Sequence, residues 1–325
     1  MIRIPRAPLN VAAASHPGTG GRQNEDRYSV SAYRLSETNR TASVFAIVSD
    51  GIGGHRAGEV AAELAVETIS HLVSQSDGSQ PLEVLGRAIQ SASGSIAATA
   101  KDNTQHLGMG TTCACAWVIG NRLFTGSVGD SRIYLLRGDS ILQLTIDHTW
   151  VQEAMEKGLL KAEQVRNHPN QHVIRRYLGS STAPQVDNRI RLAKNESDTQ
   201  SRSHQGLRLV PGDVLLLCTD GLTDVVNDQE ILAAVRSRGS VGEALQSAAQ
   251  GLVDLAVGRS GPDNITAVLL AIPGTARPKK KKVNPWVWAL VGVTVVCLLA
   301  AVLAAGGWFA FRVLLPPSPT PTLLG

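Results

Sequence analysis

The chain of 325 residues is long enough for one large or two ordinary domains, and 43% hydrophobic residues suffice for a packed core. Its formal net charge of +4 is unevenly distributed, because residues 274–325 hold six basic side chains and no acidic one. Residues 1–273 therefore carry 25 basic and 27 acidic side chains, a net charge of −2. Without a basic stripe, this balance excludes a nucleic-acid-binding role for the main part of the chain.

The apolar pattern predicts strands and helices in series from residue 44 onward. A strand at 44–48 ends in turn residues, and two consecutive helices follow at 59–73 and 82–98, where apolar residues recur at helical spacing. Gly-Asn and Gly-Asp turns then separate four short strands, which predicts an antiparallel meander. These strands are expected at 111–119, 122–128, 131–136 and 141–144.

The second half of this region repeats the alternation of strands and helices. The expected helices are 150–157, 161–166, 229–236 and 241–257, and the expected strands are 214–218 and 265–272. Residues 193–206 are polar throughout, which predicts a mobile insertion loop. Runs of antiparallel strands with paired helices before and after them indicate a layered α+β domain.

An uncharged apolar segment occupies residues 286–311. At a rise of 1.5 Å per residue, it is long enough to cross a hydrocarbon core of about 30 Å. Tryptophans stand near both of its ends, and the basic run RPKKKK at 277–282 precedes it, which places the preceding region in the cytoplasm. We therefore expect a single-pass cell-membrane protein with a basic linker at 274–285, a transmembrane helix at 286–311 and a proline-rich tail at 312–325.

Five aspartates share one local pattern, a carboxylate at the C-terminal edge of an apolar strand and beside turn residues. They are Asp26 in RQNED, Asp50 in VSDG, Asp130 in SVGDS, Asp220 in CTDG and Asp263 in GPDN. One such aspartate alone is most often a turn residue. Five of them in one domain predict that the carboxylates converge where their strands adjoin.

Converging carboxylates need a positive partner, because they repel one another and burial raises their pKa. Ligation by oxygen alone suits magnesium or manganese. Two such ions bridged by one aspartate would activate a shared water and polarise a phosphoryl oxygen. Gly51 and Gly221 would let a backbone carbonyl approach an ion. Arg22, although it could be an ordinary surface arginine, is suited to hold a phosphate through two hydrogen bonds.

Seven motifs in this order resemble the metal-dependent Ser/Thr protein phosphatases of type 2C, in particular the bacterial branch. They are RQNED, VSDGIGGHRAGE, GMGTT, VGDSRIYLLR, DHT, LLLCTDGLTD and GPDNITAVLL. The resemblance implies a catalytic domain at 15–273 after an N-terminal extension at 1–14. It implies a four-layer α/β/β/α sandwich of two antiparallel sheets flanked by helix pairs, and hydrolysis of phosphoserine and phosphothreonine in proteins with two Mn²⁺ or Mg²⁺ ions.

The resemblance also implies roles for individual residues. Asp50 matches the aspartate that bridges the two metals, and Gly51 matches the residue that offers a backbone carbonyl. The other implied metal ligands are Asp220 and Asp263 for the first ion, Glu25 and Asp26 for the second, and Asp130 with Asp220 for a third, weaker site. Arg22 matches the phosphate-binding arginine, Asn264 stands beside a ligand and orients it, and Asp224 matches an acidic position without a clear role.

The sequence departs from the family pattern directly after the first DG, where some members carry a histidine proposed as general acid. Ile52 occupies this position, so a metal-bound water or His55 remains as the proton donor. The segment at 150–178 matches the flap that tunes substrate choice, and a membrane Ser/Thr kinase is an expected partner. Two other functions stay open: a binding module that no longer hydrolyses, and a hydrolase of nucleotides or small phosphate esters.

Overall fold

The computed structural model describes residues 1–274 except 22, 54–56, 166–167 and 194. The chain divides into two compact units, Met1–Thr275 and Ala276–Gly325. The predicted transmembrane helix at 286–311 and the tail at 312–325 lie outside the described residues, as does all but Gly274 of the predicted linker. Among the helices that are described, none is both long and apolar enough to cross a bilayer.

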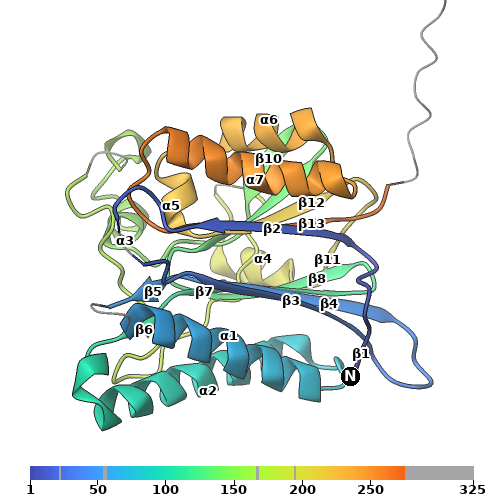
Figure 1. The fold of residues 1–325 in the computed structure, drawn as a ribbon, viewed down its shortest axis with the longest axis horizontal. Coiled ribbons are helices and arrows are strands. Elements are labelled where there is room, and N and C mark those ends of the chain that lie inside the picture. The colour runs from blue at the N-terminus through green and yellow to red at the C-terminus, as the bar shows by residue number, and fades with distance from the viewer. Residues whose placement is uncertain (22, 54–56, 166–167, 194, 275–325) are drawn as a thin grey trace, which may run out of the picture. The chain divides into compact units, whose positions relative to one another are not determined.

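Two antiparallel sheets lie face to face in the first unit (Figure 1). The larger sheet has the order β1-β3-β4-β7-β8-β11. Its strands are β1 (Ile2–Arg3), β3 (Arg27–Arg34), β4 (Ala42–Ser49), β7 (Cys113–Ile119), β8 (Arg122–Val128) and β11 (Leu207–Arg208). The smaller sheet has the order β10-β9-β12-β13-β2. Its strands are β10 (Ser140–Gln143), β9 (Arg132–Arg137), β12 (Val214–Cys218), β13 (Ile265–Ala271) and β2 (Asn10–His16).

A helix pair covers the outer face of each sheet (Figure 1). Helices α1 (Ala57–Gln75) and α2 (Pro81–Asp102) pack on the larger sheet, and α6 (Asp228–Arg238) and α7 (Glu243–Gly258) on the smaller one. The predicted α+β fold with two antiparallel sheets is therefore confirmed, and its layers run α/β/β/α. The remaining elements are the β5–β6 pair (Gly51–Ile52 with Gly110–Thr111), the short helices α3 (Trp150–Glu156), α4 (Asp198–Ser203) and α5 (Asp220–Thr223), and two 3₁₀ turns (Thr104–His106 and Ala162–Gln164).

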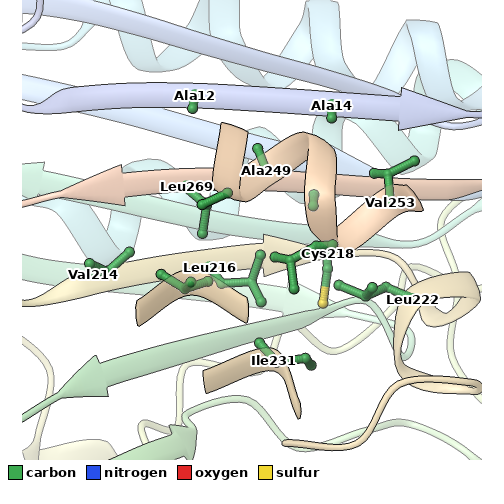
Figure 2. Close-up of a cluster of buried hydrophobic side chains, with 14 of the residues drawn as sticks. Ala12, Ala14, Val214, Leu216, Cys218, Leu222, Ile231, Ala249, Val253 and Leu269 are labelled. Atoms are coloured by element: carbon green, nitrogen blue, oxygen red, sulfur yellow. The ribbon is translucent and has the colours of Figure 1, made fainter. Parts of the chain in front are cut away.

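Strand β4 shows why the central strands are apolar without alternation. Phe45 and Ile47 point into the layer beneath α1 and α2, whereas Val44, Ala46 and Val48 pack in the layer between the two sheets. Both faces of the strand are buried, so both sets of side chains must be apolar. The third layer, beneath α6 and α7, reaches from Ala12 on β2 to Cys218 at the end of β12 and Leu222, which follows in Asp220–Thr223 (Figure 2).

The predicted four-stranded meander is wrong, because the four strands belong to two sheets. β7 pairs with β8 in the larger sheet, and β9 pairs with β10 in the smaller sheet. The chain crosses between the sheets at Gly129–Ser131, where Gly129 has a φ of 103°. Asp130 therefore sits in the crossing itself. A Gly-Asp turn shows that a strand ends, but it does not show which sheet the next strand joins.

Two further sequence predictions are corrected by the structure. Residues 1–14 are not an extension, because β2 pairs along its whole length with β13 and β1 pairs with β3. Residues 193–206 are not a simple loop, because Ser197 and Gln200 form a capping box that starts helix α4. The helix expected at 161–166 is only the 3₁₀ turn at Ala162–Gln164.

Candidate active site

The predicted carboxylates meet at one end of the two sheets. Arg27 is paired with Ser49, so Asp26 and Asp50 stand beside each other at the edge of the larger sheet. In the smaller sheet, strand β12 ends just before Asp220 at the point where β13 begins after Asp263. Asp26 and Asp263 thus precede their strands instead of following them, because the end of one antiparallel strand lies next to the start of its neighbour.

The pKa values show how closely these groups gather. Burial raises the pKa of Asp50 well above its ordinary value, and the charges of Asp220, Asp26, Asp130 and Asp263 raise it further. Burial, with the charges of Asp220 and Asp263, raises the pKa of Asp26 to about 7, although hydrogen bonds from Thr266 and Thr219 oppose the change. The five predicted aspartates therefore act on one another as a single cluster.

Three of these aspartates have a buried oxygen for which the described residues provide no hydrogen-bond donor. Asp26 and Asp130 are only 3% and 5% exposed. Within the described part of the chain, Oδ1 of Asp26, of Asp130 and of Asp220 is shielded from solvent and has no hydrogen-bond partner. Buried anionic oxygens without donors are costly unless a cation binds them. The residues present therefore fit hard divalent cations, with Asp26, Asp50, Asp130 and Asp220 as the converging donors.

Arg132 does not supply the missing positive charge. Its guanidinium binds both oxygens of Asp147, with Nη2 2.7 Å from Oδ2, and it also donates to the Tyr134 hydroxyl. The charge of Arg132 is thus already paired with the carboxylate of Asp147. Arg22, predicted to bind phosphate, and His55, a candidate proton donor, lie outside the described residues.

Threonines from the GMGTT motif hold Asp50 in place. The Asp50 carbonyl accepts hydrogen bonds from the Thr112 amide at 2.9 Å and from the Thr111 hydroxyl at 2.6 Å. The Asp50 amide donates to the Thr112 hydroxyl, which also bonds to Ser131, next to Asp130. Sequence reasoning used this motif only as a sign of the family. The structure shows that it fastens two of the clustered aspartates to each other.

Thr219 and Asn264 connect segments that are distant in sequence. The Thr219 hydroxyl donates to Asp26 Oδ2 at 2.8 Å, and this bond ties the smaller sheet to the larger one. Asn264 Oδ1 accepts from the Glu25 amide at 2.8 Å, and its side-chain amide donates to backbone carbonyls before Glu25. Asn264 therefore positions the segment carrying Glu25, whereas Asp263 beside it is exposed. The role of Thr219 was missed, because a threonine before an aspartate has no distinctive spacing.

The glycines after Asp50 and Asp220 serve close backbone packing. A Cβ on Gly51 would lie 2.3 Å from the carbonyl oxygen of Gly58, and a Cβ on Gly221 would lie 2.1 Å from that of Asn264. Neither position has room for a side chain. The sequence prediction attributed both glycines to the approach of a carbonyl to an ion. That prediction stays untested, and the structure adds a second reason, since each glycine allows a neighbouring backbone segment to pack against the loop that carries the aspartate.

A cleft of about 540 Å³ opens beside the cluster. Its lining includes Asp130, Asp220 and Asp224 together with residues of the 150–178 segment, such as His172. Burial and the charge of Asp220 raise the pKa of Asp224 to about 7, and the nearby His172 opposes this change. The clustered carboxylates Asp130 and Asp220 thus face a cleft, and Asp224 also lines it.

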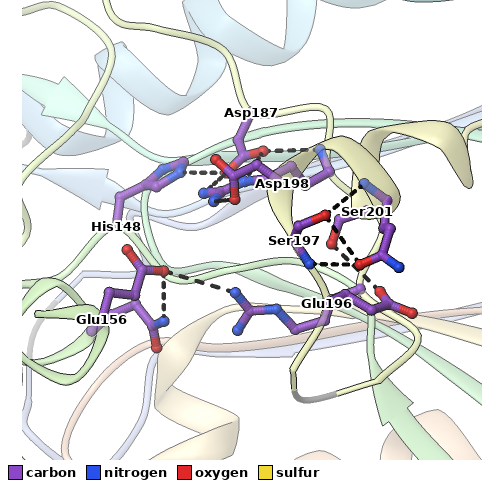
Figure 3. A network of polar contacts seen from close by, with 11 residues as sticks. His148, Glu156, Asp187, Glu196, Ser197, Asp198 and Ser201 are labelled. Carbon is purple, nitrogen blue, oxygen red and sulfur yellow. Dashed lines mark hydrogen bonds and ion pairs between the residues drawn. The ribbon is translucent and has the colours of Figure 1, made fainter. Parts of the chain in front are cut away.

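A polar network that includes His148, Asp187 and Asp198 (Figure 3) reaches the loop that carries Asp130. His148, from the DHT motif, accepts a hydrogen bond from the Gly129 amide through Nδ1 at 3.0 Å. Its Nε2 lies 3.2 Å from Asp187 Oδ2, and Asp187 is also bound by the Arg189 guanidinium. Arg189 also donates a hydrogen bond through Nη1 to Asp198 Oδ1, at the start of α4. The polar segment around α4 is therefore linked through three side chains to the crossing that presents Asp130.

Replacing Asp187 by alanine should destabilise the protein by about 3–5 kcal/mol, because it removes the acceptor of the buried His148 Nε2 and leaves the Arg189 guanidinium with the exposed Asp198 alone. Burial alone would raise the pKa of Asp187, but hydrogen bonds from His148 and Arg189 lower it well below its ordinary value. Its contribution is thus present above about pH 4 and fades as the pH falls further. Urea unfolding at pH 7 measures the loss.

The matched control is Asp198→Ala, which removes an exposed carboxylate from the same arginine. It should cost at most about 1 kcal/mol. Equal losses for the two variants would contradict the assigned importance of the buried pair.

Comparison with known proteins agrees with this geometry. Residues 15–254 match the family model described as Protein phosphatase 2C. The chain belongs to the protein phosphatase 2C family. It is 34% identical over 261 residues to serine/threonine protein phosphatase PstP of Mycobacterium tuberculosis, covering 80% of this chain and 44% of that relative. It is 32% identical over 236 residues to serine/threonine phosphatase stp of Listeria innocua, covering 71% of this chain and 86% of that one.

A solved structure with the same fold carries metal. It is the catalytic domain of serine/threonine protein phosphatase PstP in complex with two manganese ions. The two structures superpose with a TM-score of 0.64 at 32% identity, over 82% of this chain and 98% of that domain. At least one solved structure with the same fold as this chain therefore binds two manganese ions.

Proposed function

We propose that the chain is a metal-dependent protein serine/threonine phosphatase anchored in the cell membrane with its catalytic domain in the cytoplasm. The observation that carries the catalytic part is the convergence of Asp26, Asp50, Asp130 and Asp220. Three of them have a buried oxygen without a hydrogen-bond partner among the residues that the structure describes. Membership of the protein phosphatase 2C family supports the interpretation of this cluster as the metal-binding centre of a phosphatase.

Mn²⁺ or Mg²⁺ fits the donor set, since it consists of carboxylate oxygens. When bound, such ions supply a water of lowered pKa and neutralise charge on the phosphoryl group. Asp50 stands at the centre of the cluster, because the charges of four other aspartates raise the pKa of its carboxyl group. Thr111 and Thr112 hold its backbone, and Asn264 holds the segment of Glu25, so the donors keep their places without reorganisation. Arg22 is expected to bind the phosphate.

Phosphorylated proteins are the proposed substrates. The relatives from Mycobacterium tuberculosis and Listeria innocua are named serine/threonine phosphatases. The cleft is open and lies against the 150–178 flap, which suits an extended peptide. A module that no longer hydrolyses would be expected to lose carboxylates of the cluster. All the predicted acidic positions are retained, which favours an active enzyme.

The activity is tested by measuring Mn²⁺-dependent phosphate release from a phosphothreonine peptide and from a nucleotide under the same conditions. We expect efficient release from the peptide and weak release from the nucleotide. Preference for the nucleotide would support the alternative of a small-ester hydrolase. Absence of metal-dependent release from both would contradict the proposed activity.

The anchor is proposed from the uncharged segment at 286–311 and the basic run that precedes it. A catalytic domain held at the inner face would meet membrane-bound substrates at a high effective concentration. A membrane Ser/Thr kinase and its substrates are therefore the proposed partners.

Deleting residues 286–325 should move the protein from the membrane fraction to the soluble fraction, because the apolar span is lost. The control replaces the four lysines at 279–282 by glutamine, which weakens contact with anionic headgroups but leaves the span in place. This control should remain with the membrane. Cell fractionation followed by immunoblotting measures both outcomes, and a deletion variant that stays in the membrane fraction would contradict the anchor.

A further inference from the structure

The two-sheet sandwich has a second end, opposite the carboxylate cluster, and the strands run between the two ends (Figure 1). β4 begins there at Ala42 and ends beside Asp50, whereas β9 begins near Asp130 and ends there at Arg137. We call this second end the distal end. It consists of residues 3–9, 34–42, 75–80, 119–122, 137–140, 208–214, 236–243 and 271–274.

Charge is strongly separated between the two ends. The distal end holds nine basic and five acidic side chains, so its net charge is +4. Because residues 1–273 carry 25 basic and 27 acidic side chains in all, 16 basic and 22 acidic ones remain elsewhere, with a net charge of −6. The charged residues of the distal end are Arg3, Arg6, Arg34, Arg40, Arg122, Arg137, Arg208, Arg236 and Arg238, and Glu37, Asp77, Asp139, Asp213 and Glu243.

Several of these arginines are available to bind an anionic partner. Other distal arginines already hold three of the acidic residues in ion pairs, namely Glu37, Asp139 and Asp213. Four arginines are exposed and have no acidic partner among the residues that the structure describes: Arg3, Arg6, Arg40 and Arg208. They form no basic run in the sequence, because they are dispersed along the chain and meet only in the fold.

The described part of the chain also finishes at the distal end. The Ile272 amide donates to the Asp213 carbonyl at 2.8 Å, just after β13 ends. In the sequence, the basic run at 277–282 and the proposed membrane span at 286–311 follow. Residues 275–285 can extend over at most about 40 Å, so such a tether does not by itself orient the domain. A further interaction is needed to set the orientation.

We propose that the distal end docks on anionic lipid headgroups and holds the carboxylate cluster away from the membrane. This proposal rests on the proposed membrane anchor and adds the orientation of the catalytic domain. An arginine near an anionic lipid surface favours the docked state about fivefold, and several such residues act together. The net negative charge of the rest of the domain disfavours the opposite orientation.

Docking also sets the height of the active site above the membrane. β4 runs from the distal end to Asp50 and has eight residues. At about 3.3 Å per residue, it places the cluster about 25 Å from the headgroups. A phosphorylated residue must project about this far from the lipid to reach the cluster. Substrates phosphorylated in a protruding domain are therefore favoured over those phosphorylated directly beside a membrane span.

The test places the full-length chain in nanodiscs of neutral lipid with and without phosphatidylglycerol. A fluorophore is attached at Asn121→Cys, on the distal end, or at Asp102→Cys, where α2 ends, in a chain that also carries Cys297→Ser. The other three cysteines are buried and stay unlabelled. Spin-labelled headgroups should quench the Asn121→Cys reporter in anionic discs but not the Asp102→Cys reporter. Added KCl should abolish the quenching, because it screens the charges.

Arg6→Gln combined with Arg40→Gln should weaken docking about thirtyfold, since each charge contributes about fivefold. The KCl concentration that halves the quenching of the Asn121→Cys reporter should fall accordingly. Both arginines are exposed, so the fold should be kept. The matched control combines Lys101→Gln with Lys161→Gln, two exposed basic residues outside the distal end, and should leave this concentration unchanged.

Equal quenching of the Asn121→Cys reporter in neutral and anionic discs would overturn the proposal, and so would an arginine variant that behaves like its control. Co-elution of the chain with neutral discs reports the anchor separately. Quenching in anionic discs requires neither insertion of the span nor phosphate release. Failure of the anchor or of the proposed activity can therefore be told apart from failure of the distal end to dock.

Discussion

Replacing Asp50 by asparagine should lower phosphatase activity by about a thousandfold or more and leave the fold intact. Its carboxylate lies at the centre of the cluster, and the amide offers one neutral oxygen in its place. The ions of such a site contribute several kcal/mol of transition-state stabilisation, and about 4 kcal/mol corresponds to a thousandfold change in rate. Initial rates on a phosphothreonine peptide at saturating Mn²⁺ measure the effect.

The fold should tolerate this change because Thr111 and Thr112 hold Asp50 through its backbone, which asparagine retains. Without metal the variant should be at least as stable as the wild type, since one of several mutually repelling carboxylates is gone. Asp102→Asn, at the exposed end of α2, is the control and should keep full activity. Activity of the Asp50→Asn variant close to that of the wild type would rule out the cluster as the catalytic centre.

The sequence predicted those parts of the fold whose signal is local. Helices α1 and α2 carry apolar residues at helical spacing, and each extends only a few residues beyond its predicted range. Strand β4 was predicted from an unbroken apolar run, which the burial of both of its faces explains. In these elements the residues that decide the structure are neighbours in the chain.

Strands β2 and β3 were not predicted, and only for β2 does the signal lie in the partner strand. β2 is rich in alanine and becomes a strand by pairing with β13 over seven residues. β3 alternates polar and apolar residues, which is a local strand signal that the sequence analysis did not use, and it pairs with the apolar β4. The assignment of β8 and β9 to different sheets is likewise set by packing between the layers, which a local turn signal does not contain.

The candidate site was predictable where an aspartate stands beside a turn, as at Asp50 and Asp220. The residues that position it were not, because their importance comes from contacts across the fold. Thr219 reaches Asp26 over 193 positions, and His148 reaches Asp187 over 39. Neither residue belongs to a pattern of spacing that indicates such a contact. The sequence therefore indicated the acidic residues of the site, whereas the residues that position them could be identified only in the structure.

Without metal, the protein should lose stability as the pH rises from about 4 to about 7. The pKa values of Asp26 and Asp224 are both raised to about 7, mainly by burial and then by the charge of Asp220. Between the ordinary aspartate pKa and this value, the folded state binds more protons than the unfolded state, so stability falls with rising pH. Asp26 alone would contribute at most about 4 kcal/mol, for a difference of about three pKa units.

Saturating Mn²⁺ should reverse this trend, because the ion binds the deprotonated carboxylates and stabilises the folded state increasingly as the pH rises. Urea unfolding of the full-length chain at pH 5 and pH 8, with Mn²⁺ and with a chelator, measures both slopes. Asp187 does not interfere, because its lowered pKa confines its effect to pH below about 4. Asp26→Asn should reduce the slope of the metal-free protein. A metal-free protein as stable at pH 8 as at pH 5 would contradict the view that these buried carboxylates require a cation.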